Sequence, residues 1–124
     1  LLQMLELAPE YAKRYPHQVS RGQCQRAAIA RALAIAPKLI VCDEATSALD
    51  VTVQAQIVTL LKKLKQEMGL SLLFISHDLG VVQNLCDRVL VMYQGKIVEE
   101  GTPDCIIQNP KDDYTKKLIE SVFL

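Results

Sequence analysis

The chain has 124 residues, of which 14 are basic and 14 acidic, and half of its residues are apolar. This balance is typical of one soluble globular domain, or part of one, and it argues against disorder or a fibrous repeat. The zero net charge gives no general attraction to nucleic acid or anionic lipid. No apolar stretch approaches the ~20 residues of a membrane helix, and no signal peptide is evident, so we expect no membrane span.

The four cysteines lie far apart, with no Cys-x-x-Cys pair and no histidine at ligand spacing. Zinc sites and redox dithiols need close pairs, so the spacing supports neither. Four cysteines could form two disulfides, but scattered and partly apolar contexts favour reduced, buried thiols of a cytosolic protein.

The first helix signal is a capping box at Ser20–Gln23, where the serine oxygen and the glutamine side chain can satisfy free amides. It predicts a helix over Gln23–Ala36, which is rich in Ala, Leu and Arg and is ended by Pro37. The apolar run Leu39–Cys42 then predicts a short strand that is buried on both faces, as parallel strands are.

A second helix is expected to begin after Asp50, which can cap it, and to end at Gly69. Its apolar residues recur at helical spacing between these two positions. Leu70–Ser76 predicts a second buried strand, and Asp78–Cys86 predicts a short helix with Asp78 as its cap.

The last third of the chain predicts a hairpin and two helices. Val89–Tyr93 and Lys96–Glu99 flank a turn at Gln94–Gly95, where glycine can supply a positive φ. Thr102 opens a small helix, and Tyr114–Phe123 forms the last one. Helices that alternate with strands indicate an α/β fold built on a parallel sheet.

Chemically competent side chains follow the two predicted parallel strands. Asp43 and Glu44 end the first strand, and His77 comes just after the second. Ligands of open parallel sheets bind outside the carboxyl ends of the strands. One carboxylate could hold a hard cation while the other orients an attacking water. Each residue alone could equally be a solvated group at the end of an element.

The Ser20–Gln23 segment also has two possible interpretations. It can simply cap a helix, or the same free amides and helix dipole can bind a phosphate, which Gly22 would allow to approach closely. Residues 1–38 hold six basic and two acidic side chains, which modestly favours an anion.

Three ordered strings carry a family resemblance: VSRGQCQRAAIARAL, LIVCDEATSALD and LLFISHDL. They resemble the C-terminal part of the nucleotide-binding domain of ATP-binding cassette (ABC) transporters. The resemblance implies a RecA-like P-loop NTPase sheet with flanking helices, only its C-terminal portion, and residues 1–124 as one partial domain. The flanks YPHQ, DVTVQAQI and NPKDDYTKKLIESV resemble ATPase subunits of oligopeptide, dipeptide and nickel importers.

The resemblance also implies roles for individual residues. Ser20, Gly22 and Gln23 would occupy the signature motif, which contacts the γ-phosphate of ATP held on an opposing subunit. Ser47–Asp50 would form the D-loop, which couples the two facing sites.

The same resemblance implies roles for the residues that follow the two predicted strands. Asp43 would be the Walker B carboxylate that helps to hold Mg²⁺, Glu44 the general base or water-orienting residue, and His77 the switch histidine on the γ-phosphate. Phosphoryl transfer depends mainly on positioning and charge neutralisation, which these groups can supply.

The resemblance implies ATP and Mg²⁺ as cofactors. The implied partners are transmembrane permease subunits and a second ATPase subunit in a head-to-tail dimer, with no nucleic acid. The implied location is peripheral, at the cytoplasmic face of the inner membrane.

The sequence departs from the family pattern in three respects. Arg21 stands where a glycine is usual, and Cys24 replaces a usually basic residue, which predicts a weakened signature function. No GxxxxGK[ST] phosphate loop and no glutamine loop occur in these 124 residues. The strand that feeds the phosphate loop belongs between the switch-histidine strand and the next one, so we expect an incomplete sheet that folds poorly or associates.

Three functions remain open on these grounds. The first is a segment of a peptide-importer ATPase that is inactive alone. The second is a truncated or degenerate, non-catalytic module that binds a partner subunit. The third is a non-transport ABC ATPase in DNA repair or on the ribosome, which the neutral charge disfavours.

Overall fold

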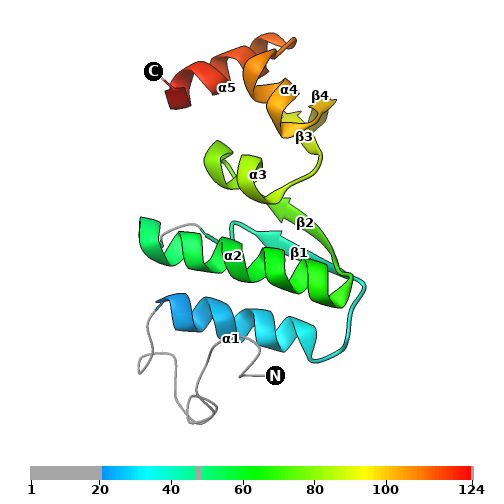
Figure 1. Ribbon diagram of the computed structural model, residues 1–124. Helices are drawn as coiled ribbons and strands as arrows, with labels where there is room; N and C mark the ends of the chain where they lie inside the picture. The colour runs from blue at the N-terminus through cyan, green and yellow to red at the C-terminus, as the bar shows by residue number, and fades with distance from the viewer. Residues whose placement is uncertain (1–20, 47–48, 124) are drawn as a thin grey trace. The chain divides into compact units, whose positions relative to one another are not determined.

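The computed structural model of the chain describes residues 21–46 and 49–123, which divide into two units between Ser76 and His77. The first unit contains, in chain order, two helices that alternate with two strands: α1 (Arg21–Leu33), β1 (Leu39–Asp43), α2 (Val51–Met68) and β2 (Ser71–Ile75). Figure 1 shows α2 alongside the two strands and α1 packed against α2.

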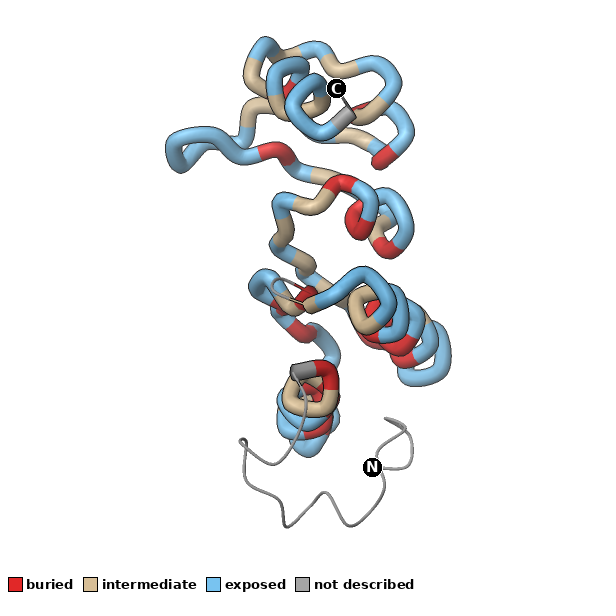
Figure 2. Tube along the Cα trace, turned by 90° about the vertical axis from the view of Figure 1, so that its left-hand side faces the viewer, coloured by how far each residue is buried: buried red, intermediate tan, exposed pale blue. Residues whose placement is uncertain are grey.

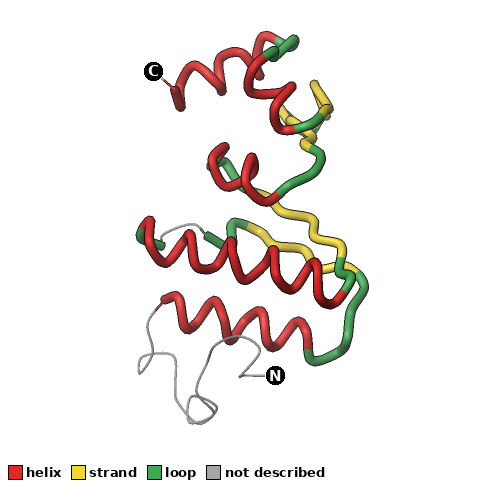
Figure 3. Tube along the Cα trace, in the orientation of Figure 1, coloured by secondary structure: helices red, strands yellow, loops and turns green. Residues whose placement is uncertain are grey.

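The second unit contains three helices and a hairpin. Its elements are α3 (Leu79–Leu85), β3 (Val89–Tyr93), β4 (Lys96–Gly101), α4 (Pro103–Gln108) and α5 (Asp113–Phe123). Figure 3 shows the two strands in yellow and the helices in red. The chain is thus mixed α/β, with one parallel and one antiparallel strand pair, which confirms the predicted fold class and hairpin.

Strands β1 and β2 pair in parallel, in a register that sets Leu39 opposite Ser71 and Asp43 opposite Ile75. The strands therefore end together at one edge of the sheet. A backbone hydrogen bond from Ser71 to Lys38 closes the other end of the ladder, with an N···O distance of 2.9 Å.

Helix α2 has the predicted caps. The carboxylate of Asp50 accepts a hydrogen bond from the amide of Val53, and Gly69 ends the helix with a φ of 63°, which suits glycine. Its apolar stripe is buried, as the red positions along this helix in Figure 2 show, and comprises Ile57, Val58, Leu60, Leu61 and Leu64.

Helix α1 differs from its predicted bounds. It ends at Leu33 rather than at Ala36. Ala36 takes a positive φ of 50°, which an α-helix does not allow. The helix already includes Arg21, and the predicted cap Ser20 lies outside the described residues.

The prediction that the parallel strands are buried on both faces is wrong. Alternate side chains of β1 and β2 are exposed, with Leu39, Val41, Leu73 and Ile75 each about half accessible. Ile40 and Cys42, which point to the other face of β1, are buried. Within the described residues, therefore, only one face of this sheet is covered.

The two strand pairs form separate sheets, and β2 has no hydrogen-bonded neighbour other than β1 among the described residues. The hairpin turn itself is as predicted, with positive φ values at Gln94 and Gly95.

The carboxylate of Glu99 on β4 holds the start of α5. It accepts hydrogen bonds from the backbone amides of Lys111 and Asp112, at 3.0 and 2.8 Å. Asp112 in turn accepts one from the amide of Tyr114, whose ring stacks on Tyr93. These contacts attach the polar segment before α5 to the hairpin, and sequence reasoning did not identify Glu99.

Acid should weaken this attachment. The Asp112 amide, followed by the Lys111 amide and the Lys111 charge, lowers the pKa of Glu99 from its usual 4.5, against the opposing effect of desolvation. A carboxyl group whose pKa is lower in the folded than in the unfolded chain stabilises the fold at pH values above its unfolded pKa. That stabilisation is lost as the pH falls through the pKa of the folded state. Glu99→Gln should therefore cost up to about 1 kcal/mol at pH 7 and less at pH 3.

Urea unfolding at both pH values, followed by circular dichroism, measures this difference. Glu100→Gln is the matched control, because Glu100 forms an exposed ion pair with Arg88 that contributes little. Equal effects of the two substitutions at pH 7 would contradict the assignment of Glu99 as the attachment point.

The four cysteines, all within the described residues, form no disulfide; Cys42 is buried and Cys105 is exposed. None of the described helices combines the length and apolar character needed to cross a membrane.

Candidate functional site

Asp43 and Glu44 lie where β1 leaves the sheet. Asp43 is the last residue of the strand, opposite Ile75 of β2. The backbone amide of Glu44 donates a hydrogen bond to the carbonyl of Ile75, with an N···O distance of 2.8 Å. Both acidic residues are exposed, so two carboxylates face solvent at the carboxyl edge of the parallel pair.

The backbone of Glu44 is strained. Its φ is 53°, the left-handed region, which costs a non-glycine residue about 1 kcal/mol. The hydrogen bond to Ile75 holds the residue there, followed by a turn through Ala45 and the buried Thr46. Strain of this kind concentrates at functional positions. Nothing in the sequence signalled it.

His77 opens the second unit, two residues after the end of β2, and it is exposed. The next residue, Asp78, caps α3 as predicted: its carboxylate accepts hydrogen bonds from Gly80 and Val81 at 3.0 and 3.3 Å. The structure thus brings Asp43 and Glu44 together, whereas His77 belongs to the other unit.

Gly22 and Gln23 lie in the first turn of α1. This turn itself contains no acidic residue. The amides at the start of a helix lack partners within the helix and lie at the positive end of its dipole. Ser20, the third residue predicted for this motif, is outside the described residues.

Asp50 serves as the cap of α2, with its carboxylate 2.9 Å from the amide of Val53. The Val53 side chain also borders Gly22, so the first turns of α1 and α2 meet at this residue. The motif pattern did not single out Val53; only the packing identifies it.

The described residues contain no group of three or more His, Cys, Asp or Glu side chains able to hold a metal ion. Mg²⁺ does not need such a cage, since it commonly binds through one or two carboxylates together with water and substrate phosphates. Asp43, an exposed oxygen donor beside a second carboxylate, fits a site of that kind.

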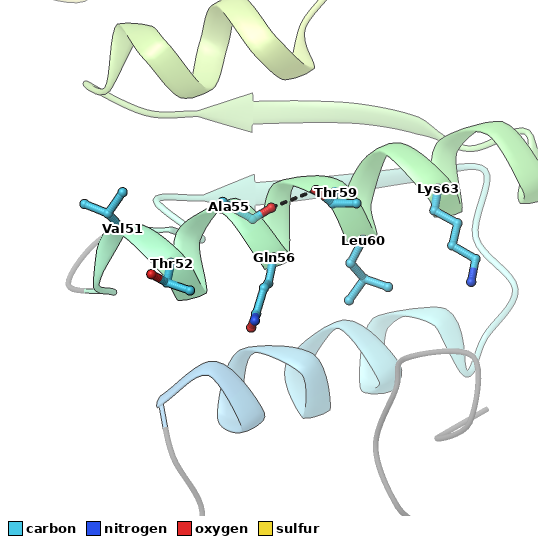
Figure 4. A pocket seen from close by; sticks show the side chains of 7 residues that line it. All are labelled: Val51, Thr52, Ala55, Gln56, Thr59, Leu60 and Lys63. Carbon is cyan, nitrogen blue, oxygen red and sulfur yellow. Dashed lines mark hydrogen bonds between the residues drawn. The ribbon is translucent and has the colours of Figure 1, made fainter.

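A groove of about 540 Å³ runs along α2 and is lined by seven residues of this helix, from Val51 to Lys63. Figure 4 shows its side chains, among which Thr52, Gln56, Leu60 and Lys63 point to the side of α2 on which α1 lies. The Thr59 hydroxyl donates a hydrogen bond of 2.9 Å to the backbone carbonyl of Ala55. None of the predicted site residues is among the described residues that line this groove, so it is not the candidate site.

Comparison with known proteins identifies the family. Residues 1–47 match the ABC transporter family. The chain is 60% identical over 116 residues to the oligopeptide transport ATP-binding protein OppF of Salmonella typhimurium, across 94% of this chain and 35% of OppF. It is 52% identical over 122 residues to the glutathione import ATP-binding protein GsiA of Pectobacterium atrosepticum, across 98% of this chain and 20% of GsiA.

Solved structures agree with this assignment. The chain is similar to the ATP-binding cassette MJ0796 in a dimeric, post-hydrolysis state bound to ADP and Pi, with a TM-score of 0.70 and 39% identity. The match covers 82% of this chain and 44% of that one. A second dimeric structure of MJ0796, a bacterial ABC transporter cassette, matches equally well.

The chain spans about a third of the length of OppF and a fifth of GsiA. Over that span it has the fold of part of an ABC cassette, a P-loop NTPase, and it belongs to the ABC transporter ATP-binding proteins that include OppF and GsiA.

Proposed function

We propose that this chain supplies the signature, D-loop and hydrolytic residues of an ABC ATPase that powers the import of peptides or similar small solutes. One observation carries the proposal: Asp43 and Glu44 lie side by side at the carboxyl edge of β1 and β2, and Glu44 is held there in a strained conformation. The similarity to OppF and GsiA supports the peptide-type cargo.

In this proposal each residue acts on ATP or on water. Asp43 holds Mg²⁺, which neutralises phosphate charge when it is bound. Glu44 orients the attacking water and accepts its proton, and His77 contacts the γ-phosphate. Gly22 and Gln23 present helix amides to the γ-phosphate of ATP on an opposing subunit, and Asp50 couples the two sites. The resemblance assigns Ser20 to the same motif.

The proposed partners follow from the same assignment. They are transmembrane permease subunits and a second ATPase subunit in a head-to-tail dimer, at the cytoplasmic face of the inner membrane. The dimeric MJ0796 cassettes support the pairing of ATPase subunits. The neutral net charge favours no nucleic-acid partner.

Residues 1–124 form only part of a nucleotide-binding domain in this proposal. They contain no GxxxxGK[ST] loop to surround the phosphates. Taken by themselves, they should therefore neither bind nor hydrolyse ATP.

A hybrid protein tests the proposal. The 116 matched residues of Salmonella OppF are replaced by the corresponding residues of this chain, and ATP hydrolysis by the purified hybrid is compared with that of OppF. We expect a rate within about tenfold of OppF, because Asp43, Glu44 and His77 are retained; Arg21 accounts for the expected reduction.

The alternative is a non-catalytic module that binds a partner subunit, which Arg21 and the missing phosphate loop favour. A hybrid that folds and binds ATP but does not hydrolyse it would support this alternative and contradict the proposal. Restoring glycine at position 21 in that hybrid would then show whether the arginine is responsible.

A further inference from the structure

Gly22 is buried at the point where the first turn of α1 meets the first turn of α2. A Cβ atom added to Gly22 would lie 2.6 Å from Cγ1 of Val53, so close for two non-bonded carbon atoms that one of them would have to shift. Gly22 does not have a positive φ, so its backbone would accept any residue. The position therefore needs glycine for lack of space and not for its conformational freedom.

Val53 cannot move aside easily. It is β-branched, and in a helix such a side chain has essentially one favoured rotamer. Its amide is also fixed, because it donates the 2.9 Å hydrogen bond to the capping carboxylate of Asp50. Val53 thus touches the signature segment through its side chain and the D-loop segment through its backbone.

We propose that Val53 is a positioning residue that fixes the start of α1, with Gly22 and Gln23 of the proposed signature segment, relative to Asp50 of the proposed D-loop segment. Its importance for ATP hydrolysis rests on the proposed function, which assigns both segments to that reaction. The contact itself does not depend on nucleotide. A displacement of α1 by even a few tenths of an ångström should change both segments together.

Three variants of the 124-residue chain test the contact. Gly22→Ala should lower Tm by about 5 °C, although alanine ordinarily stabilises a helix relative to glycine. Val53→Ala alone should lower it less. In the double variant the new Cβ would meet the Cβ of residue 53 at 3.9 Å, an ordinary contact, so most of the loss should be recovered.

Amide exchange measured by NMR separates positioning from general destabilisation. In Gly22→Ala the amide of residue 53 should exchange at least about tenfold faster, because the Asp50 cap is displaced, while the amide of Leu61 in the same helix changes much less. Gly101→Ala is the control, since a Cβ there would find its nearest neighbours at 3.7 Å. Equal acceleration at residues 53 and 61, or no recovery in the double variant, would overturn the proposal.

The OppF hybrid gives the functional result. Gly22→Ala should reduce its ATP hydrolysis at least about tenfold, and adding Val53→Ala should restore most of it. An inactive parent hybrid would contradict the proposed function while leaving the NMR result intact. An active parent in which Val53→Ala gives no recovery would contradict the positioning role alone.

Discussion

Glu44→Gln should reduce ATP hydrolysis by the OppF hybrid at least about 100-fold, with little change in ATP binding. A general base typically contributes a factor of about 10² to 10⁴, and glutamine has nearly the same size but cannot accept the proton. Glu44 lies beside Asp43, and its backbone is fixed to β2, so the substitution should not displace its neighbour. Steady-state rates and equilibrium binding of ATP measure the two effects separately.

Glu67→Gln, an exposed substitution on α2 far from the proposed chemistry in sequence, is the control and should leave the rate unchanged. A Glu44→Gln hybrid with more than about a tenth of the parent rate would contradict the role of Glu44. The strain at this position gives an independent check in the chain itself: Glu44→Gly should be about 1 kcal/mol more stable than Glu44→Ala, because glycine accepts a φ of 53°.

Leu61→Ala should lower the free energy of unfolding of the first unit by about 3 kcal/mol. Leu61 lies in the middle of α2 and is only 1% exposed, so the truncation removes buried contacts and leaves a cavity. The higher helix propensity of alanine offsets only a few tenths of a kcal/mol. Urea unfolding followed by circular dichroism measures the change.

Leu73→Ala is the matched control. Leu73 is a leucine of β2 that is 49% exposed, on the uncovered face of the sheet, and its truncation should cost less than about 1 kcal/mol. Similar costs for Leu61 and Leu73 would show that this face is covered in solution, for example by self-association.

Local signals in the sequence predicted most of the elements. Asp50, Asp78 and Thr102 cap helices as their types suggest, and each accepts a hydrogen bond from an amide in the first turn. The parallel pairing of the strands followed from their apolar runs and the helix between them. These features depend on residues close together in the chain, which is why they can be read without the structure.

Features that depend on packing or on backbone strain were not predictable. The apolar composition of β1 suggested burial on both faces, but composition cannot say whether a second layer is present. The early end of α1 at Leu33 and the left-handed φ of Glu44 arise in residues that do not favour such conformations. The attachment of α5 by Glu99 joins residues 12 and 13 positions apart, with no motif to mark it.

The candidate site, too, was predictable from the sequence only in part. The family resemblance identified Asp43, Glu44 and His77 as candidates. The structure adds that Asp43 ends β1 at the edge of the sheet and that the backbone of Glu44 is strained. The roles of all seven predicted residues stay predictions. The role of Val53 could come only from the packing around Gly22, where an added Cβ would lie 2.6 Å from Cγ1 of Val53.

Calorimetric titration of ATP and Mg²⁺ into the purified 124-residue chain, beside the OppF hybrid, is the most direct measurement. If the chain contributes groups that act on ATP but not the loop that holds it, the hybrid should bind ATP while the chain releases no binding heat at millimolar nucleotide. Micromolar binding by the chain itself, or its own turnover of ATP, would contradict this account.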